Sequence, residues 1–194
     1  MKLTHLIFIF LLFAFQSTYA EVTKTVLPET HLIEWKLLDE NLELKLIQRL
    51  PDQTRSFFEG RGFSKKITNN IAQSCVFQTI TRNTSKAKDQ TIHVALKNWS
   101  IKINNKTRAI KLKEDWDKEW TDNDVKPASR LAFRWATFPT EQSFEPSGDY
   151  NWGMISFGPK PGSQFDLYIE WKNNNKTKSV WIKNMTCPTN VLAN

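Results

Sequence analysis

The sequence of 194 residues has only two cysteines, three histidines and six glycines, and it has no long apolar run after its first twenty residues. No stretch rich in glycine, proline or serine divides it, so residues 21–194 are expected to form a single domain. Without a later run of about twenty apolar residues, we expect no membrane-spanning helix in the mature chain. The motifs Gly-x-Ser-x-Gly and His-Glu-x-x-His and glycine-rich phosphate loops are missing, which argues against the common hydrolase, metalloprotease and nucleotide-binding classes.

The longest apolar run lies at the start of the chain, from Leu6 to Phe15. It follows a short positively charged beginning and precedes a small residue, Ala20. This order is typical of a secretory signal peptide, here residues 1–20, with cleavage after Ala20. The run is too short to cross a bilayer core, which needs about twenty residues. We therefore predict an exported protein, either periplasmic or extracellular.

The two cysteines, Cys75 and Cys187, both follow the predicted signal peptide. Two thiols in an oxidising compartment usually pair, so we predict a disulfide between them. A catalytic redox pair normally has the spacing Cys-x-x-Cys, which does not occur, and two distant sulfurs without neighbouring histidines make a poor zinc site. The sequence therefore predicts a structural disulfide and neither a cofactor nor a bound metal.

The chain is basic, with a formal charge of +7 that falls by one when Lys2 leaves with the signal peptide. This excess of positive charge favours an anionic partner such as an acidic exported protein, an acidic glycan or phospholipid headgroups. Alternatively, the charge only keeps the protein soluble. Export removes the protein from nucleic acid. Basic residues surround two predicted hairpin turns and would form one patch if the turns lie side by side. They are Lys102, Lys106, Arg108, Lys111 and Lys113 at the first turn, and Lys172, Lys176, Lys178 and Lys183 at the second.

Alternation of apolar and polar residues dominates the rest of the chain. Phe165, Leu167, Ile169 and Trp171 are each separated by one more polar residue, which is the pattern of a half-buried strand. The segments that show this pattern or read as apolar strands are 76–82, 92–96, 99–103, 108–112, 130–135, 165–171 and 179–185. The parity changes between the second and third of these segments, which indicates a bulge or a break between two strands.

The segment 33–50 fits two structures. Leu42, Leu44 and Leu46 alternate as in a strand, whereas leucines four residues apart fit a helix equally well. In a helix, the charged residues between the leucines would share the apolar region, so we expect strands.

Two or three short helices are also predicted. One begins at Pro51, one follows Ser64 as a capping residue, and one has the acidic residues Glu114 and Asp115 in its first turn. Many short strands with few helices predict a mainly β domain, an antiparallel β-sandwich or a barrel-like fold.

The segment 138–153 has no clear period and is the candidate binding site. Seven of the eight tryptophans fall in predicted strands or on a helix stripe, where they are expected to pack inside, and Trp152 is the exception. A loop of this length in a compact domain is usually functional. We predict that it binds a peptide, a protein or a sugar without catalysis; otherwise it seals the core. The binding residues would be Phe144, Glu145, Asp149, Tyr150, Asn151 and Trp152.

Two other functions rank lower. A copper-handling accessory protein of the periplasm would use His31, His93, Met154 and Met185, which are scattered and show no ligand spacing. A hydrolase would use the paired carboxylates of a glycosidase, for which the loop acids are the only candidates. Two acids four residues apart in a loop that contains proline are a weak signal for such a pair.

Overall fold

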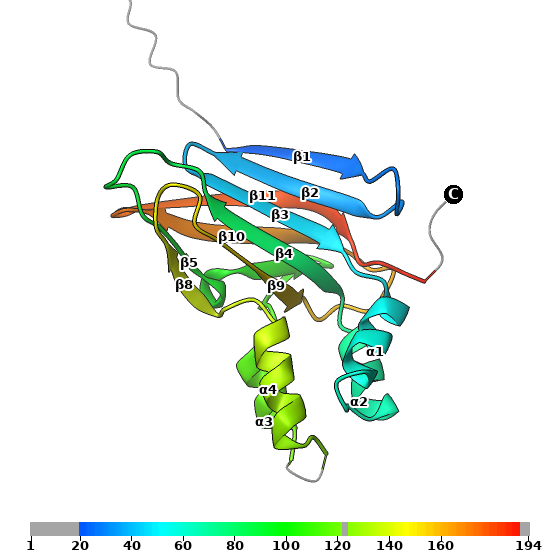
Figure 1. Cartoon of the computed structure of the whole chain (residues 1–194). Helices are drawn as coiled ribbons and strands as arrows, with labels where there is room; N and C mark the ends of the chain where they lie inside the picture. The colour runs from blue at the N-terminus through cyan, green and yellow to red at the C-terminus, as the bar shows by residue number, and fades with distance from the viewer. Residues whose placement is uncertain (1–19, 122–123, 191–194) are drawn as a thin grey trace, which may run out of the picture.

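The computed structural model describes residues 20–121 and 124–190 and shows a mainly β domain of two antiparallel sheets that pack face to face (Figure 1). The predicted signal peptide, residues 1–20, lies outside the described residues except for Ala20. Within the described ranges, no helix is long and apolar enough to cross a membrane.

The first sheet has five strands in the order β1-β2-β3-β4-β9, and every neighbouring pair is antiparallel. Its strands are β1 (Glu21–Val26), β2 (Ile33–Asp39), β3 (Leu42–Gln48), β4 (Val76–Asn83) and β9 (Tyr150–Ser156). The segment 33–50 therefore forms strands, as predicted. Leu42, Leu44 and Leu46 are buried while Glu43 and Lys45 between them are partly exposed, because successive side chains point to opposite faces.

The second sheet has six strands arranged around β10. Its strands are β5 (Ile92–Ala95), β6 (Ser100–Ile103), β7 (Lys106–Ala109), β8 (Glu141–Phe144), β10 (Gln164–Asn173) and β11 (Lys176–Thr186). β11 pairs with one edge of β10, and β5 and β6 pair with different halves of the other edge. The predicted break between these two strands is a short 3-10 helix, Leu96–Asn98.

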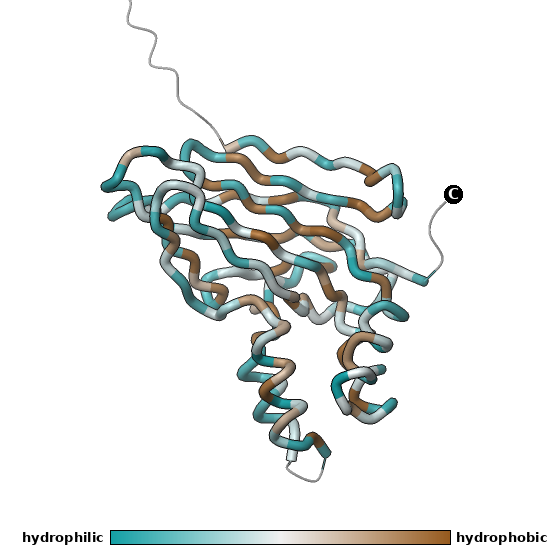
Figure 2. Tube along the Cα trace, in the orientation of Figure 1, coloured by the Kyte–Doolittle hydropathy of each residue, from teal (hydrophilic) through white to brown (hydrophobic). Residues whose placement is uncertain are grey.

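The main core lies between the two sheets and consists of their inward side chains. Figure 2 shows hydrophobic and hydrophilic residues alternating along the strands. Trp35 and Phe77 of the first sheet and Trp99, Leu167 and Trp171 of the second are almost fully buried in one cluster. In strands such as β3 and β10, this alternation places the apolar face between the sheets, whereas the residues of β7 are all exposed.

The disulfide between Cys75 and Cys187 is present and confirms the prediction. Cys75 directly precedes β4 of the first sheet, and Cys187 directly follows β11 of the second. The bond therefore crosslinks the two sheets. Cys75 has a φ of +57°, a backbone conformation that costs non-glycine residues free energy.

Two helix pairs project from the same end of the sandwich (Figure 1). The four helices in the described part are α1 (Pro51–Glu59), α2 (Lys65–Ala72), α3 (Lys113–Glu119) and α4 (Pro127–Ala136). The first three confirm the predicted helices, and the Ser64 hydroxyl oxygen caps α2 by accepting a hydrogen bond from the N–H of Ile67. Aromatic rings from both pairs form a second core, in which Phe133 contacts Trp120, Phe58 and Phe63.

The fourth helix corrects a prediction, because α4 contains the segment 130–135, which we expected to be a strand. Pro127 begins the helix at a position that suits proline. Its buried residues, Ser129, Phe133 and Ala136, follow helical spacing. The Arg130 side chain donates hydrogen bonds to the Asp117 carboxylate and to the carbonyl of Trp120, which ties α4 to α3. The apolar residues of this segment also alternate as in a strand, but these tertiary contacts form only when the segment is a helix.

The contact between α3 and α4 predicts a pH dependence. A hydrogen bond from Arg134 is the largest cause that lowers the pKa of Asp117 below its ordinary value, and a hydrogen bond from Arg130 adds to it, while desolvation opposes both. A carboxyl group with a lowered pKa in the folded state stabilises the protein above its unfolded pKa, and this stabilisation is lost as the pH falls through the folded value. We therefore expect Asp117→Asn to destabilise the protein at neutral pH and to lose its effect in acid.

The measurement is urea unfolding of wild-type protein and Asp117→Asn at neutral pH and below about pH 4, where aspartate takes up protons. Glu29→Gln, at an exposed position between β1 and β2, is the matched control. If Asp117→Asn destabilises the protein equally at both pH values, the lowered pKa of Asp117 does not stabilise the folded state.

Candidate functional site

The segment 138–153 is two strands and a turn and not the long aperiodic loop that we predicted. β8 pairs with β5 of the second sheet, and β9 pairs with β4 of the first, so the segment passes from one sheet to the other. Phe138 and Phe144 point into the core, with their rings stacked and their centroids 6.5 Å apart. Phe144 therefore does not line a binding surface, which corrects that part of the prediction.

The two acidic residues of the segment hold its turn. The backbone N–H of Glu145 donates a hydrogen bond of 2.9 Å to the Asp149 carboxylate, and the Thr91 hydroxyl donates one of 3.5 Å to the Glu145 carboxylate. Gly148 has a φ of +93°, a conformation that glycine adopts at little cost. Asn151 donates a hydrogen bond from its amide to Gln142. These contacts are those of a turn, and they give the hydrolase hypothesis no specific support.

Tyr150 and Trp152 lie on the outer face of the first sheet. They are two residues apart on β9, and their side chains are 54% and 55% exposed. Arg82 lies opposite Tyr150 and Ile80 opposite Trp152 on β4. The Arg82 guanidinium lies 5.4 Å from the centre of the Tyr150 ring. The two aromatic residues predicted for binding at the end of the segment are therefore accessible.

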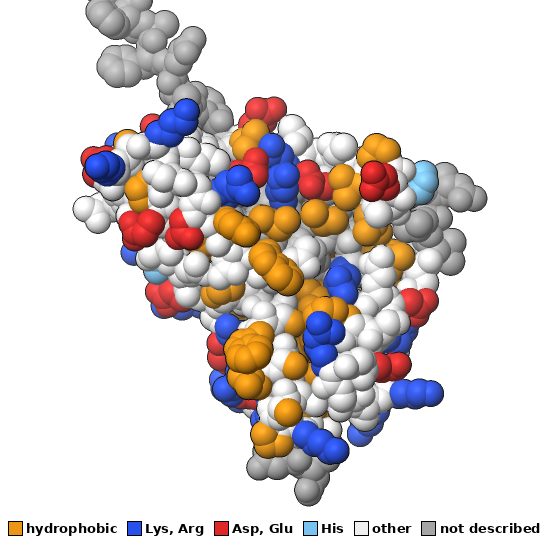
Figure 3. Space-filling view, in the orientation of Figure 1, with side chains coloured by type: hydrophobic (Ala, Val, Ile, Leu, Met, Phe, Trp, Pro, Cys, Tyr) orange, Lys and Arg blue, Asp and Glu red, His pale blue; other side chains and the backbone are white. Residues whose placement is uncertain are grey.

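Helix α4 adds two exposed apolar residues that the sequence placed in a strand. Leu131 is 46% exposed, and Trp135 is 77% exposed although it was expected to pack inside. The last turn of α4 lies beside β9, because Thr137 forms a bridge with Met154 and the Phe138 N–H donates to the Met154 carbonyl. Figure 3 shows hydrophobic side chains gathered over the first sheet and onto this helix. We call Leu131, Trp135, Tyr150 and Trp152 the aromatic face.

Two further arginines stack on an aromatic ring near this face. Arg49 continues β3 with the outward parity of Lys45, and its N–H donates to the carbonyl of Val76. The guanidinium carbons of Arg49 and Arg61 lie 4.9 Å and 3.4 Å from the centre of the Phe57 ring. Burial lowers the pKa of Arg49, and the nearby positive charge of Arg61 lowers it further.

None of these arginines has a carboxylate partner within the described residues. The ion pairs formed by other arginines join Arg55 to Asp52, and Arg130 and Arg134 to Asp117. Arg49, Arg61 and Arg82 instead lie over rings, and the buried Nε of Arg49 has no hydrogen-bond partner in this part of the chain. Arg49 and Arg61 each donate one side-chain hydrogen bond to a nearby backbone carbonyl, which leaves their positive charge without an ion pair. The three charges are therefore available to an anionic partner.

The possible metal ligands are not brought together. His31 lies between β1 and β2, whereas His93 on β5 hydrogen-bonds Ser143 and Glu141. Met154 and Met185 are buried in different core clusters. Residues 20–121 and 124–190 contain no group of three histidine, cysteine or acidic residues that would hold a metal.

The two basic turns do not combine into one patch. β6 pairs with β10 near its start, where Asp166 lies opposite Lys102, whereas the turn after β10 lies at its far end, near Asn173. The lysines of the second turn are also partly neutralised, since Lys178 pairs with Asp39 at 2.7 Å. The two turns therefore lie at opposite ends of the second sheet.

Comparison of the chain with family models, curated proteins and solved structures finds no match. The candidate site therefore depends on its own geometry. Sequence reasoning found Tyr150 and Trp152 but missed Trp135 and the arginines around Phe57. The proline that begins α4 is the signal that would have identified that helix and its exposed side.

Proposed function

We propose that this chain is an exported, non-enzymatic binding protein whose aromatic face docks onto another exported protein that carries apolar and acidic side chains. The observation that carries the proposal is the exposure of Trp135, at 77%, near the end of the helix that adjoins β9, together with that of Tyr150 and Trp152 on β9, each more than half exposed. Large aromatic side chains are costly to leave in water, and clusters of them mark interaction surfaces. Tryptophan, tyrosine and arginine are also the residues that contribute most to protein interfaces.

The charges around this face favour an acidic partner. Arg82 lies over Tyr150, and Arg49 and Arg61 lie over Phe57, and none of the three forms an ion pair with a described carboxylate. Glu43 lies opposite Arg82 on β3 but pairs with Lys36 at 3.1 Å. Stacking on a ring and one hydrogen bond to a backbone carbonyl, as in Arg49 and Arg61, leave further N–H donors of the guanidinium for a carboxylate of a partner. The formal charge of +7 acts in the same direction over longer distances.

The disulfide supports an exported location. Cys75 and Cys187 are bonded, and such bonds persist mainly in oxidising compartments. A partner would then be another protein of the periplasm or the extracellular space.

The experiment places a photo-crosslinking amino acid at position 135 of the full chain in its native host and identifies the crosslinked protein by mass spectrometry. Binding of the purified partner is then measured for wild type, Trp152→Ala and Trp135→Ala. We expect each substitution to weaken binding by about 1–3 kcal/mol, and higher salt to weaken it further.

Trp181→Ala is the matched control. Trp181 is 36% exposed on β11 of the other sheet, where its ring packs at a tilt against that of Tyr168. Two results would refute the docking face. One is an equal loss of affinity in Trp181→Ala and Trp152→Ala, and the other is unchanged affinity in both Trp152→Ala and Trp135→Ala.

Trp152→Ala also tests whether the tryptophan is instead part of the core. Because its side chain is more than half exposed, we expect the substitution to change the free energy of unfolding by less than about 1 kcal/mol. A tryptophan that sealed the core would cost roughly 3–5 kcal/mol. Urea unfolding measures the difference, and a loss in the larger range would assign Trp152 a structural role.

A further inference from the structure

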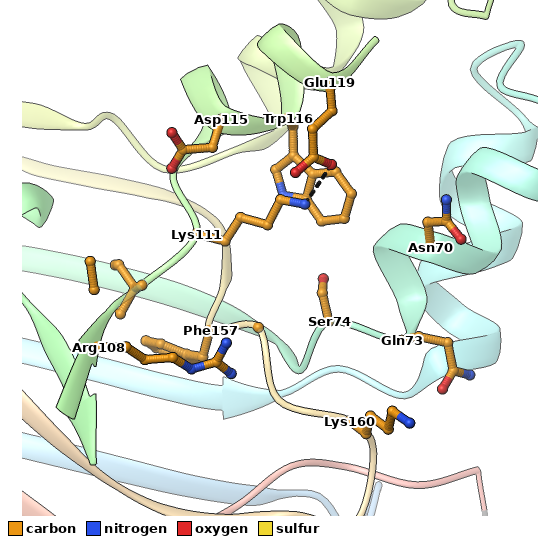
Figure 4. A pocket seen from close by; sticks show the side chains of 13 residues that line it. Asn70, Gln73, Ser74, Arg108, Lys111, Asp115, Trp116, Glu119, Phe157 and Lys160 are labelled. Carbon is orange, nitrogen blue, oxygen red and sulfur yellow. Dashed lines mark hydrogen bonds and ion pairs between the residues drawn. The ribbon is translucent and has the colours of Figure 1, made fainter. Parts of the chain in front are cut away.

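A cavity of about 590 Å³ lies between the two helix pairs, and none of its lining residues belongs to the aromatic face. α2 forms one wall and α3 the other, and the end of β7 and the segment after Phe157 form the floor (Figure 4). Its polar and charged lining residues are Asn70, Gln73, Ser74, Arg108, Lys111, Asp115, Glu119 and Lys160. Cavities between about 300 and 1,000 Å³ are the size that holds small ligands.

Arg108, an exposed residue of β7, lies against the cavity floor over Gly158. Its Nη2, Cζ and Nη1 atoms lie 3.4, 3.6 and 3.6 Å from the position that a Cβ atom on Gly158 would take, so the guanidinium lies flat over the glycine. The Gly158 N–H donates a hydrogen bond of 2.8 Å to the Ser74 carbonyl, which fixes this backbone. Gly158 has a φ of +95°, which side chains other than glycine rarely adopt.

Two cations of the lining have no ion-pair partner in the described chain. Arg108 and Lys160 form no salt bridge there, whereas Lys111 pairs with Glu119 at 2.7 Å and its Nζ lies 3.5 Å from the centre of the Trp116 ring. The Asp115 carboxylate caps α3 by accepting a hydrogen bond from the N–H of Leu112. The charges of Lys111 and Glu119 cancel each other. The remaining charges of the lining are the positive charges of Arg108 and Lys160 and the negative charge of the capping carboxylate.

Two amides of α2 and its C-terminal end also face the cavity. The side chains of Asn70 and Gln73 line it and make no hydrogen bond with another described residue, and Figure 4 shows both on the α2 wall. Amides without a partner and unpaired cations in the lining of one cavity supply donors for an oxyanion and for neighbouring hydroxyl groups.

We infer that this cavity binds a sugar-sized ligand that carries a phosphate, sulfate or carboxylate group. Arg108 and Lys160 pair with the anionic group, and Asn70 and Gln73 hydrogen-bond to its hydroxyl groups. An arginine held flat by a glycine presents the N–H edge of its guanidinium to an oxyanion, and two such donors recognise it bidentately. This site is separate from the aromatic face, so it stands or fails independently of the proposed docking function.

The test titrates the full oxidised chain with glucose 6-phosphate, glucose 6-sulfate, glucuronic acid, inorganic phosphate and glucose, followed by calorimetry and by the amide NMR signals of Ser74 and Gly158. We expect at least one charged sugar to bind at least tenfold more tightly than glucose and to shift both signals. The charged sugar that binds most tightly identifies its anionic group, and inorganic phosphate shows how much of the affinity that group supplies alone.

Arg108→Met and Lys160→Met remove one charge each while keeping an extended side chain, and we expect each to weaken binding of that sugar at least tenfold. Lys106→Met is the matched control, because Lys106 lies on the same strand as Arg108 but outside the lining, and we expect less than a twofold change. Thermal unfolding shows whether each variant is folded. If Arg108→Met does not fold, Lys160→Met still tests the site.

Three results would overturn the site. One is equal binding of glucose and all charged sugars, and another is equal affinity of Arg108→Met, Lys160→Met and Lys106→Met. The third is binding that leaves the signals of Ser74 and Gly158 unmoved, because these residues form the floor beneath Arg108.

Discussion

Replacing Cys75 and Cys187 together by alanine is expected to lower the free energy of unfolding by roughly 4–5 kcal/mol. The bond closes a loop with a sequence separation of 112 residues, and a crosslink over such a loop removes much of the entropy of the unfolded chain. It also joins the start of β4 in one sheet to the end of β11 in the other, so its loss removes the disulfide crosslink between the two sheets, which the backbone alone then connects. Folding free energies of domains are about 5–15 kcal/mol, so this loss is a large fraction of the total.

Urea unfolding with and without a reductant measures this effect. Wild-type protein in reductant should match the double variant, and the double variant should not respond to reductant. Protein taken from its native compartment should show no alkylated cysteine by mass spectrometry. Free thiols there, or equal unfolding midpoints for wild type and the double variant, would refute the structural role of the bond.

Phe133→Ala is expected to lower the free energy of unfolding by roughly 3–5 kcal/mol. The Phe133 side chain is 2% exposed, and its ring centre lies 4.8 Å from that of Trp120 and 5.4 Å from that of Phe58. It therefore joins α4 to both α3 and α1, and its removal leaves a cavity that the surrounding rings fill only in part. For a domain of this size, each kcal/mol corresponds to a change of about 2–4 °C in the melting temperature.

Trp135→Ala on the same helix is the matched comparison, since it removes a larger side chain that is 77% exposed. We expect this substitution to change the free energy of unfolding by less than about 0.5 kcal/mol. Thermal and urea unfolding of both variants gives the comparison. Equal small losses would mean that the helical cluster is not a core, and equal large losses would mean that Trp135 is not a free surface residue.

Strands were predictable where alternation was repeated over a whole element. In β3 and β10, apolar residues recur at every second position with polar residues between them, and one face of each strand packs between the sheets. Local sequence carries this information, because the direction of each side chain follows from the backbone alone. The β10–β11 hairpin and the three predicted helices were therefore found without knowledge of the rest of the fold.

The segment 130–135 shows where the same reasoning failed. Leu131, Phe133 and Trp135 alternate, but residues four apart also share one side of a helix, so the pattern does not distinguish the two structures. The hydrogen bonds from Arg130 to Asp117 and Trp120 and the packing of Phe133 against the other helices decide for a helix. None of these contacts can be inferred from the segment itself.

The binding prediction failed in part for a related reason. Phe144 and Trp152 look alike in the sequence, as aromatic residues in a segment without period. β8 joins the second sheet and turns Phe144 into the core, while β9 joins the first sheet and turns Trp152 outward. Which sheet each short strand joins depends on partners that are roughly fifty to eighty residues away in the sequence.

The sequence by itself determined the mainly β class and the disulfide, because alternation is a local property and a chain with two cysteines has only one possible pair. Only the tertiary structure decided which aromatic residues are accessible, that Arg49 and Arg61 stack on Phe57, and that Arg108 lies over Gly158 at the floor of a cavity. The physical reason is that burial and the pairing of charges are properties of surfaces brought together from distant parts of the chain.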